Sequence, residues 1–99
     1  MEVNPLKIIH DKDNELSSIL ESTRQCALSE DGIPLKYKLL IALALDADHG
    51  AVEGVKNLAM QAMEEGATKE EIMQAVRVAY YICGAGTVYT AANALRDIL

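Results

Sequence analysis

The chain has 99 residues and a formal net charge of −6, a length that suits one domain with its own hydrophobic core. The acidic balance argues against nucleic acid and against an anionic membrane surface as partners, because both attract clustered Lys and Arg. The two cysteines are too few and too far apart for a disulfide framework. No charged leader followed by an apolar run opens the chain. We therefore expect one domain over residues 1–99 in the cytoplasm.

The first third of the chain predicts a lead-in followed by one helix. Residues 1–10 contain Pro5 and are expected to be irregular or a short turn. An acidic start at Asp11 and Asp13 suits the positive end of a helix dipole. Apolar or small residues then recur at spacings of three and four, which is the helical period: Leu16, Ile19, Leu20, Thr23 and Ala27.

The stretch from Pro34 to about Leu45 predicts the central helix of the domain. Its residues 39–45 are all apolar, and a helix without a polar side is expected to be buried on all sides. Seven residues are far fewer than the roughly twenty that span a bilayer. A polar break, Asp46–Gly50, follows this helix.

Three further helices are expected after the break. One carries an apolar face from Val52 to Met63 and stops at Gly66, since glycine suits the left-handed residue at a helix end. Thr68 and Glu71 form a capping box for the next helix, which runs to about Cys83. Its inward residues are expected to be Ile72, Ala75, Val76, Ala79 and Ile82 or Cys83.

The last helix is expected over residues 87–99. Its buried residues are predicted to be Val88, Ala91, Ala92, Leu95 and Ile98. No stretch alternates with period two, so the fold class is all-α, a compact bundle of about five helices. Residues 78–83 are apolar or aromatic nearly all round, which predicts a subunit contact and a homo-oligomer.

The sequence of residues 33–99 resembles the carboxymuconolactone decarboxylase family, which includes the alkylhydroperoxidase D-like proteins. The Leu-Ile-Ala-Leu-Ala run, the segment Gly66-Ala67-Thr68-Lys69-Glu70-Glu71-Ile72 and the segment Ala91-Ala92-Asn93-Ala94-Leu95 carry the resemblance. It implies an alkylhydroperoxidase D-like bundle, a trimer or hexamer, and a link to peroxide or antioxidant chemistry. Residues 1–32 are then a lead-in and a first helix before the family region.

The resemblance also implies where the redox site of the hydroperoxidase branch would lie. Counted back without gaps from Gly66, its two cysteine positions fall on Ala51 and Gly54, its histidine on Leu58 and its glutamate on Leu39. Peroxide reduction of this kind needs a thiolate and a second thiol that resolves the sulfenic acid. Since the cysteine pair is absent, no catalytic residue carries over, and these four positions remain candidates for lining a pocket.

Asp46, Asp48 and His49 form the cluster with acid–base or metal-binding potential. In the alternative interpretation, one aspartate caps the following helix and His49 is a solvated turn residue. The spacing matches no familiar ligand pattern, so we expect neither a metal nor a cofactor.

Cys83 is the second candidate, as a reactive thiol near the start of the last helix or as a buried packing residue. The chain's other cysteine, Cys26, is expected to be a packing residue. Tyr80 and Tyr81 are expected to line a pocket or a subunit interface.

Three functions remain open from the sequence. The first is a peroxidase relative of degenerate or variant activity, without the cysteine pair. The second is a decarboxylase-type lyase that acts on a small anionic lactone through His49, with Lys36, Lys38 or Lys56 near the substrate unless these are solvated charges. The third is a non-catalytic oligomeric protein that binds a small-molecule ligand.

Overall fold

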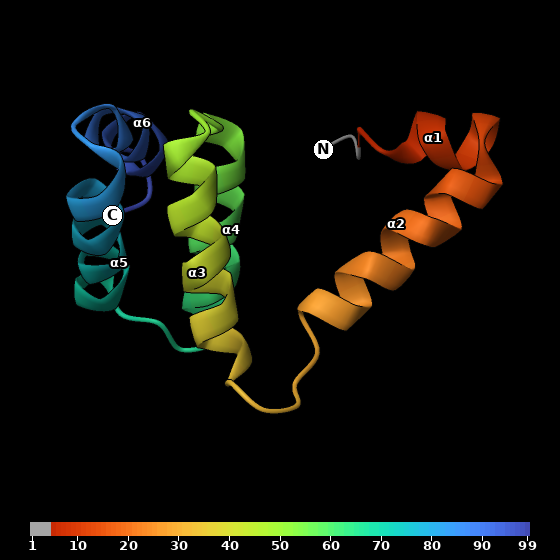
Figure 1. Ribbon diagram of the computed structural model, residues 1–99, viewed down its shortest axis with the longest axis horizontal. Helices are drawn as coiled ribbons and strands as arrows, with labels where there is room; N and C mark the ends of the chain where they lie inside the picture. Colours follow the sequence, from red (N-terminus) through yellow and green to blue (C-terminus); the bar gives the residue numbers. More distant parts are fainter. Residues whose placement is uncertain (1–4) are drawn as a thin grey trace.

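Helix α3 (Leu35–Asp48) is the helix around which the others pack in the computed structural model, which describes residues 5–99. It contacts α4 (Val52–Glu64), α5 (Lys69–Cys83) and α6 (Gly86–Leu95), and α6 also packs on α4 and α5 (Figure 1). The regular elements of the described residues are all α-helices, as predicted. None of these helices is both long and apolar enough to cross a membrane.

The core of this four-helix bundle combines a few branched side chains with many alanines. Leu43, Val55 and Ile72 are the largest fully buried side chains. Buried alanines let the helix axes approach closely, and they come from all four helices: Ala47, Ala59, Ala62, Ala79, Ala91 and Ala94. The absence of Phe and Trp from the sequence is therefore matched by a closely packed core of small residues.

Helix α5 begins at the predicted capping box. The Thr68 hydroxyl accepts a hydrogen bond from the Glu71 N–H (3.0 Å), and the Glu71 carboxylate accepts one from the Thr68 N–H (2.9 Å). The second carboxylate oxygen of Glu71 lies 3.2 Å from Lys36 Nζ at the start of α3. Gly66, with φ of +94°, ends α4 as expected.

The first two helices form an arm that projects away from the bundle (Figure 1). Helices α1 (Lys7–Lys12) and α2 (Asn14–Ala27) pack against each other, and neither contains a buried residue. Asp13 caps α2 by accepting a hydrogen bond from the Leu16 N–H (3.0 Å). Residues 7–10 are helical, so the expectation of an irregular lead-in was wrong there. The part that concerns residues 1–4 lies outside the described residues. The extra helix makes six in residues 5–99 instead of about five.

Helix α3 differs from the prediction in length and in burial. It continues to Asp48, and the turn to α4 consists of residues 49–51. Its core side is buried, but Tyr37, Ile41 and Leu45 on the opposite side are 43%, 52% and 58% exposed. The expectation that α3 is buried on all sides was therefore wrong, because α4, α5 and α6 leave one side of it uncovered within this chain.

The last turn of α5 and the ends of α6 were also assigned incorrectly. Ile82, Cys83 and Val88 are exposed, because Gly84 turns the chain away directly after α5 and no neighbouring helix covers this turn. Helix α6 ends at Leu95, and its buried side includes Thr87 in place of the exposed Ala92. Cys26, in the arm, is exposed as well.

The linker between the arm and the bundle is held by one lysine. Lys38 Nζ donates to the Ser29 carbonyl (2.6 Å), to the Ser29 hydroxyl (3.2 Å) and to the Asp31 carbonyl (2.9 Å). Lys38 is therefore bound to the chain, where the sequence had suggested either a solvated charge or a substrate-binding cation. These contacts, together with the packing of Leu28 against the core, hold the linker at the base of α3.

Candidate functional site

One end of the bundle gathers most of the candidate residues. Helices α3 and α5 end there and helices α4 and α6 begin there, so Asp46, Asp48, His49 and Cys83 lie at the same end (Figure 1). The turn from α3 to α4 uses Gly50, whose φ of +74° favours glycine. It is closed by a hydrogen bond from the Ala51 N–H to the Asp46 carbonyl (2.9 Å).

Asp46 occupies the space beside Gly54 in the first turn of α4. A Cβ atom built on Gly54 would overlap Asp46 Oδ2 and would lie 3.0 Å from its Cγ. Gly54 has an ordinary helical backbone, so the absence of a side chain matters here for space and not for conformation. The Asp46 carboxylate also lies close to the positive end of the α4 dipole, where a negative charge is stabilised.

The sequence-based expectation of an aspartate cap for α4 was wrong. The N-cap position is Ala51, and no side chain accepts a capping hydrogen bond there. Asp46 and Asp48 belong to the last turn of α3 and not to the turn that follows it. His49 is the exposed residue that ends α3.

The Asp48 carboxylate interacts with the Cys83 thiol, although the two residues are 35 positions apart in sequence. Partial loss of solvation raises the pKa of the Cys83 thiol, and the hydrogen bond and negative charge of Asp48 raise it further. Cys83 is exposed, so it is not the buried packing residue of the alternative prediction. The thiol is accessible to solvent, and its raised pKa disfavours the thiolate.

The other candidates are not brought into one pocket with these groups. Leu39 is in the core near the opposite end of the bundle, beside a hollow of about 130 Å³ that Gln61 and Glu64 also line. Leu58 packs against the core from α4. Tyr80 and Tyr81 are exposed on the last turns of α5, and Tyr81 is 84% exposed. Among residues 5–99, no group of three or more His, Cys, Asp or Glu side chains is arranged to hold a metal ion.

Two of the lysines proposed for substrate binding lie at the wrong end of the bundle. Lys36 pairs with Glu71 and lies over the Tyr37 ring, 4.9 Å from its centroid. Lys38 holds the arm linker. Both are engaged where α3 begins, whereas Asp46, Asp48 and His49 are at its other end.

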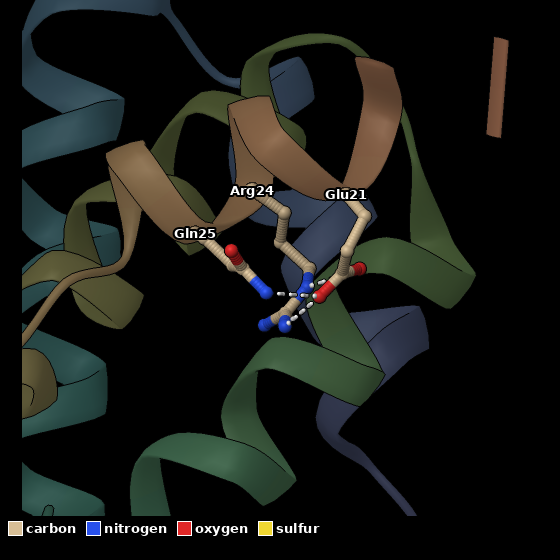
Figure 2. Close-up of polar contacts among 3 residues, drawn as sticks. All are labelled: Glu21, Arg24 and Gln25. Carbon is tan, nitrogen blue, oxygen red and sulfur yellow. Dashed lines mark hydrogen bonds and ion pairs between the residues drawn. The ribbon is translucent and has the colours of Figure 1, made fainter. Parts of the chain in front are cut away.

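A larger hollow, which the sequence analysis missed, lies between the two helices of the arm. Its volume is about 600 Å³, and its lining includes Leu6, Ile9 and Leu20 together with Lys7, Glu21 and Arg24. In Figure 2, Arg24 and Gln25 both point toward the Glu21 carboxylate, to which each donates a hydrogen bond. The bonds from Arg24 lower the pKa of Glu21. The spacing of Glu21, Arg24 and Gln25 along one helix was the available signal for this network.

The fold and the position of the polar groups define the class of this protein. It is an all-helical bundle with a projecting helical arm, and its polar groups lie where the central helix turns into the next one. The model of the carboxymuconolactone decarboxylase family matches residues 15–97, and the chain belongs to this family. The match includes α2, so it begins well before residue 33, where the sequence resemblance had been placed.

A solved structure agrees with this assignment. The fold is similar to the crystal structure of the apo form of a carboxymuconolactone decarboxylase family protein from Legionella pneumophila, with a TM-score of 0.86 and 26% sequence identity. The similarity covers 92% of this chain and 81% of the Legionella chain. A search of curated proteins gave no match.

Proposed function

We propose that this protein is an alkylhydroperoxidase D-like member of its family in which two-cysteine peroxide reduction has been lost. The observation that carries the proposal is the position of the Asp46 carboxylate beside Gly54. The family resemblance assigns a redox cysteine to this position, yet the space of its Cβ atom is filled by Asp46 Oδ2. The other assigned position, Ala51, has no thiol either.

Cys83 does not replace the missing pair. The attacking species in peroxide reduction is the thiolate, and the pKa of Cys83 is raised by partial burial and by Asp48. Cys83 also ends α5, where the negative end of the helix dipole disfavours a thiolate. The chain's other cysteine, Cys26, is in the arm, in the last turn of α2, so Cys83 has no resolving partner within its own bundle.

Hydroperoxide consumption with a thiol reductant tests this proposal. We expect no turnover above the protein-free rate for the wild type, for Cys83→Ser or for Cys26→Ser, while a two-cysteine peroxidase run in parallel shows that the assay detects turnover. Wild-type activity that disappears in Cys83→Ser alone would refute the proposal, because it would identify Cys83 as a peroxidatic residue. Activity that survives both substitutions would refute the thiol argument altogether.

A second candidate function is proton-transfer chemistry of the decarboxylase type on a small lactone. It is favoured by the interaction of Asp48, on α3, with Cys83, on α5, at the end of the bundle where His49 also lies. The engagement of Lys36 and Lys38 elsewhere counts against an anionic substrate. Carboxymuconolactone is the test substrate for this candidate, because loss of carbon dioxide requires a free carboxylate.

The decarboxylase candidate makes a separate prediction. Loss of carbon dioxide from the lactone should disappear in His49→Ala, with the helical circular dichroism unchanged because His49 is an exposed turn residue. The exposed His10→Ala on the arm is the matched control and should keep the wild-type rate. Equal rates in wild type and His49→Ala would eliminate this candidate without affecting the proposal on peroxide reduction.

A further inference from the structure

The small hollow beside Leu39 lies between the end of the arm and the base of the bundle. Its volume is about 130 Å³. Arg24 and Leu28 line it from the side of the arm. The bundle contributes side chains from the first turns of α3 and from the end of α4, among them Leu35, Glu64 and Glu65. One cation of the arm and two carboxylates of the bundle therefore line the same small space.

The two carboxylates lie at the end of α4 where a negative charge is least favoured. Glu64 is the last residue of α4 and Glu65 is its C-cap, and the last turn contains no basic residue. Among residues 5–99, neither carboxylate takes part in an ion pair. The negative end of a helix dipole stabilises a cation. A guanidinium placed there would be stabilised by the dipole and by both carboxylates.

Arg24 is held by a partner that it can exchange. Its Nε and Nη2 atoms donate to the Glu21 carboxylate within α2 (Figure 2). The two side chains are 58% and 51% exposed, and an ion pair this exposed contributes little because water solvates both charges. Gln25 also donates to Glu21 (3.2 Å), so the Glu21 carboxylate keeps one donor of α2 when Arg24 leaves it.

The arm can turn about a point close to Arg24. No residue of α1 or α2 is buried, so a rotation of these helices disrupts no core packing. Leu28, by contrast, packs against the core, and Lys38 holds Ser29. The pivot therefore lies at the end of α2, about 6 Å along the helix from Arg24. A small rotation at Leu28 changes the position of Arg24 relative to α4.

We propose that Arg24 is a salt-bridge switch that gives the arm two positions relative to the bundle of its own chain. In the open position, which this structure shows, Arg24 pairs with Glu21 and the hollow is present. In the closed position Arg24 pairs with Glu64 or Glu65, and the end of α2 moves onto α4 and closes the hollow over Leu35. The exchange conserves an ion pair, so both positions are populated. The switch depends on neither the peroxide nor the lactone chemistry proposed above.

Distances between two spin labels on one chain test the switch. In the full-length protein with Cys26→Ser and Cys83→Ser, the labels are attached at Ser18→Cys on α2 and Gln74→Cys on α5, both exposed positions. Labelled chains are diluted with excess unlabelled chains, so that only distances within one chain are measured. Position 18 is about 15 Å along α2 from the pivot and therefore moves about 2.5 times as far as position 24. We expect two distance populations, the shorter of which is the closed arm.

Substitutions of the two sets of carboxylates should act in opposite directions. Glu21→Gln releases Arg24 and should raise the ratio of closed to open chains about two- to fivefold, the effect expected of one exposed ion pair. Glu64→Gln combined with Glu65→Gln should lower the ratio by a similar factor. In an Arg24→Gln background, neither change should alter the ratio. Glu53→Gln, at the start of α4, is the matched control and should leave the ratio as in the wild type.

Three results would overturn the proposal. The first is a distance distribution that Glu21→Gln leaves unchanged, because Arg24 would then have no second partner to take. The second is a shift in the same direction for Glu21→Gln and for the pair Glu64→Gln and Glu65→Gln, which would reflect net charge and not an exchange of partners. The third is an equal effect of Glu53→Gln. All the substituted side chains are exposed, so the variants should keep the helical circular dichroism of the wild type.

Discussion

Adding a methyl group at Gly54 tests whether Asp46 occupies the place of a side chain at that position. In an unobstructed helical position, alanine is favoured over glycine by about 1 kcal/mol. At Gly54, however, the new Cβ atom would overlap Asp46 Oδ2 and lie 3.0 Å from Asp46 Cγ. Overpacking of this kind costs about 1–3 kcal/mol. We therefore expect Gly54→Ala to lower the free energy of unfolding by about 1 kcal/mol.

The same substitution should have the opposite sign when Asp46 is replaced. In an Asp46→Ala background the obstructing oxygen is gone, so Gly54→Ala should raise the free energy of unfolding by about 1 kcal/mol. The double-mutant cycle then gives a coupling of about 2 kcal/mol between the two positions. This coupling free energy measures the steric conflict between the Asp46 carboxylate and a side chain at position 54.

Urea unfolding followed by circular dichroism gives the four free energies. All four proteins must be compared at the same concentration, since any assembly adds a concentration-dependent term. A stabilisation of equal size in both backgrounds would refute the reasoning, because it would mean that Asp46 moves aside without cost. The argument that the family's second cysteine position is filled would then fail with it.

Two further predictions concern ionisation. Because Asp48 contributes to the raised pKa of the Cys83 thiol, Asp48→Asn should move the pH midpoint of Cys83 alkylation to lower pH and leave that of the chain's other cysteine unchanged; an unmoved midpoint would contradict the contact. The backbone N–H of Thr68 lowers the pKa of Glu71 from its usual 4.5, and Lys36 lowers it further. A lowered pKa gives stability that is present above the unfolded-state value and is lost as the pH falls through the folded-state value, so Glu71→Gln should flatten the loss of stability below about pH 4.5. If Glu70→Gln flattens the loss of stability at low pH by the same amount, the effect does not come from the pKa of Glu71.

The features that the sequence predicted correctly are local ones. The capping box depends on residues three positions apart, Thr68 and Glu71, and both of its hydrogen bonds are present. The apolar faces of α4 and α5 follow the helical period, and Val55, Ile72 and Val76 are buried as expected. Periodicity identifies the apolar side of a helix, and the helices that pack against the apolar sides of α4 and α5 belong to the same chain.

The predictions fail where the residues that a side chain contacts, or would need to contact, are distant from it in sequence. The stripe of α2 and the uninterrupted apolar run of α3 were correctly identified as apolar, but periodicity cannot tell whether another helix of the chain packs on Ile19 or Ile41, and both are exposed. The role of Lys38 depends on the path of a linker that has no helical or strand pattern. Likewise, the influence of Asp48 on Cys83 arises only when the C-terminal ends of α3 and α5 are brought together.

The bonds of Lys38 and the packing of Leu28 against the core both hold the linker between the arm and the bundle. The polar share of this attachment is concentrated in one ammonium group, whose three oxygen partners all lie in the linker. Replacing Lys38 by a neutral side chain would therefore remove all three bonds at once and leave the apolar contact of Leu28.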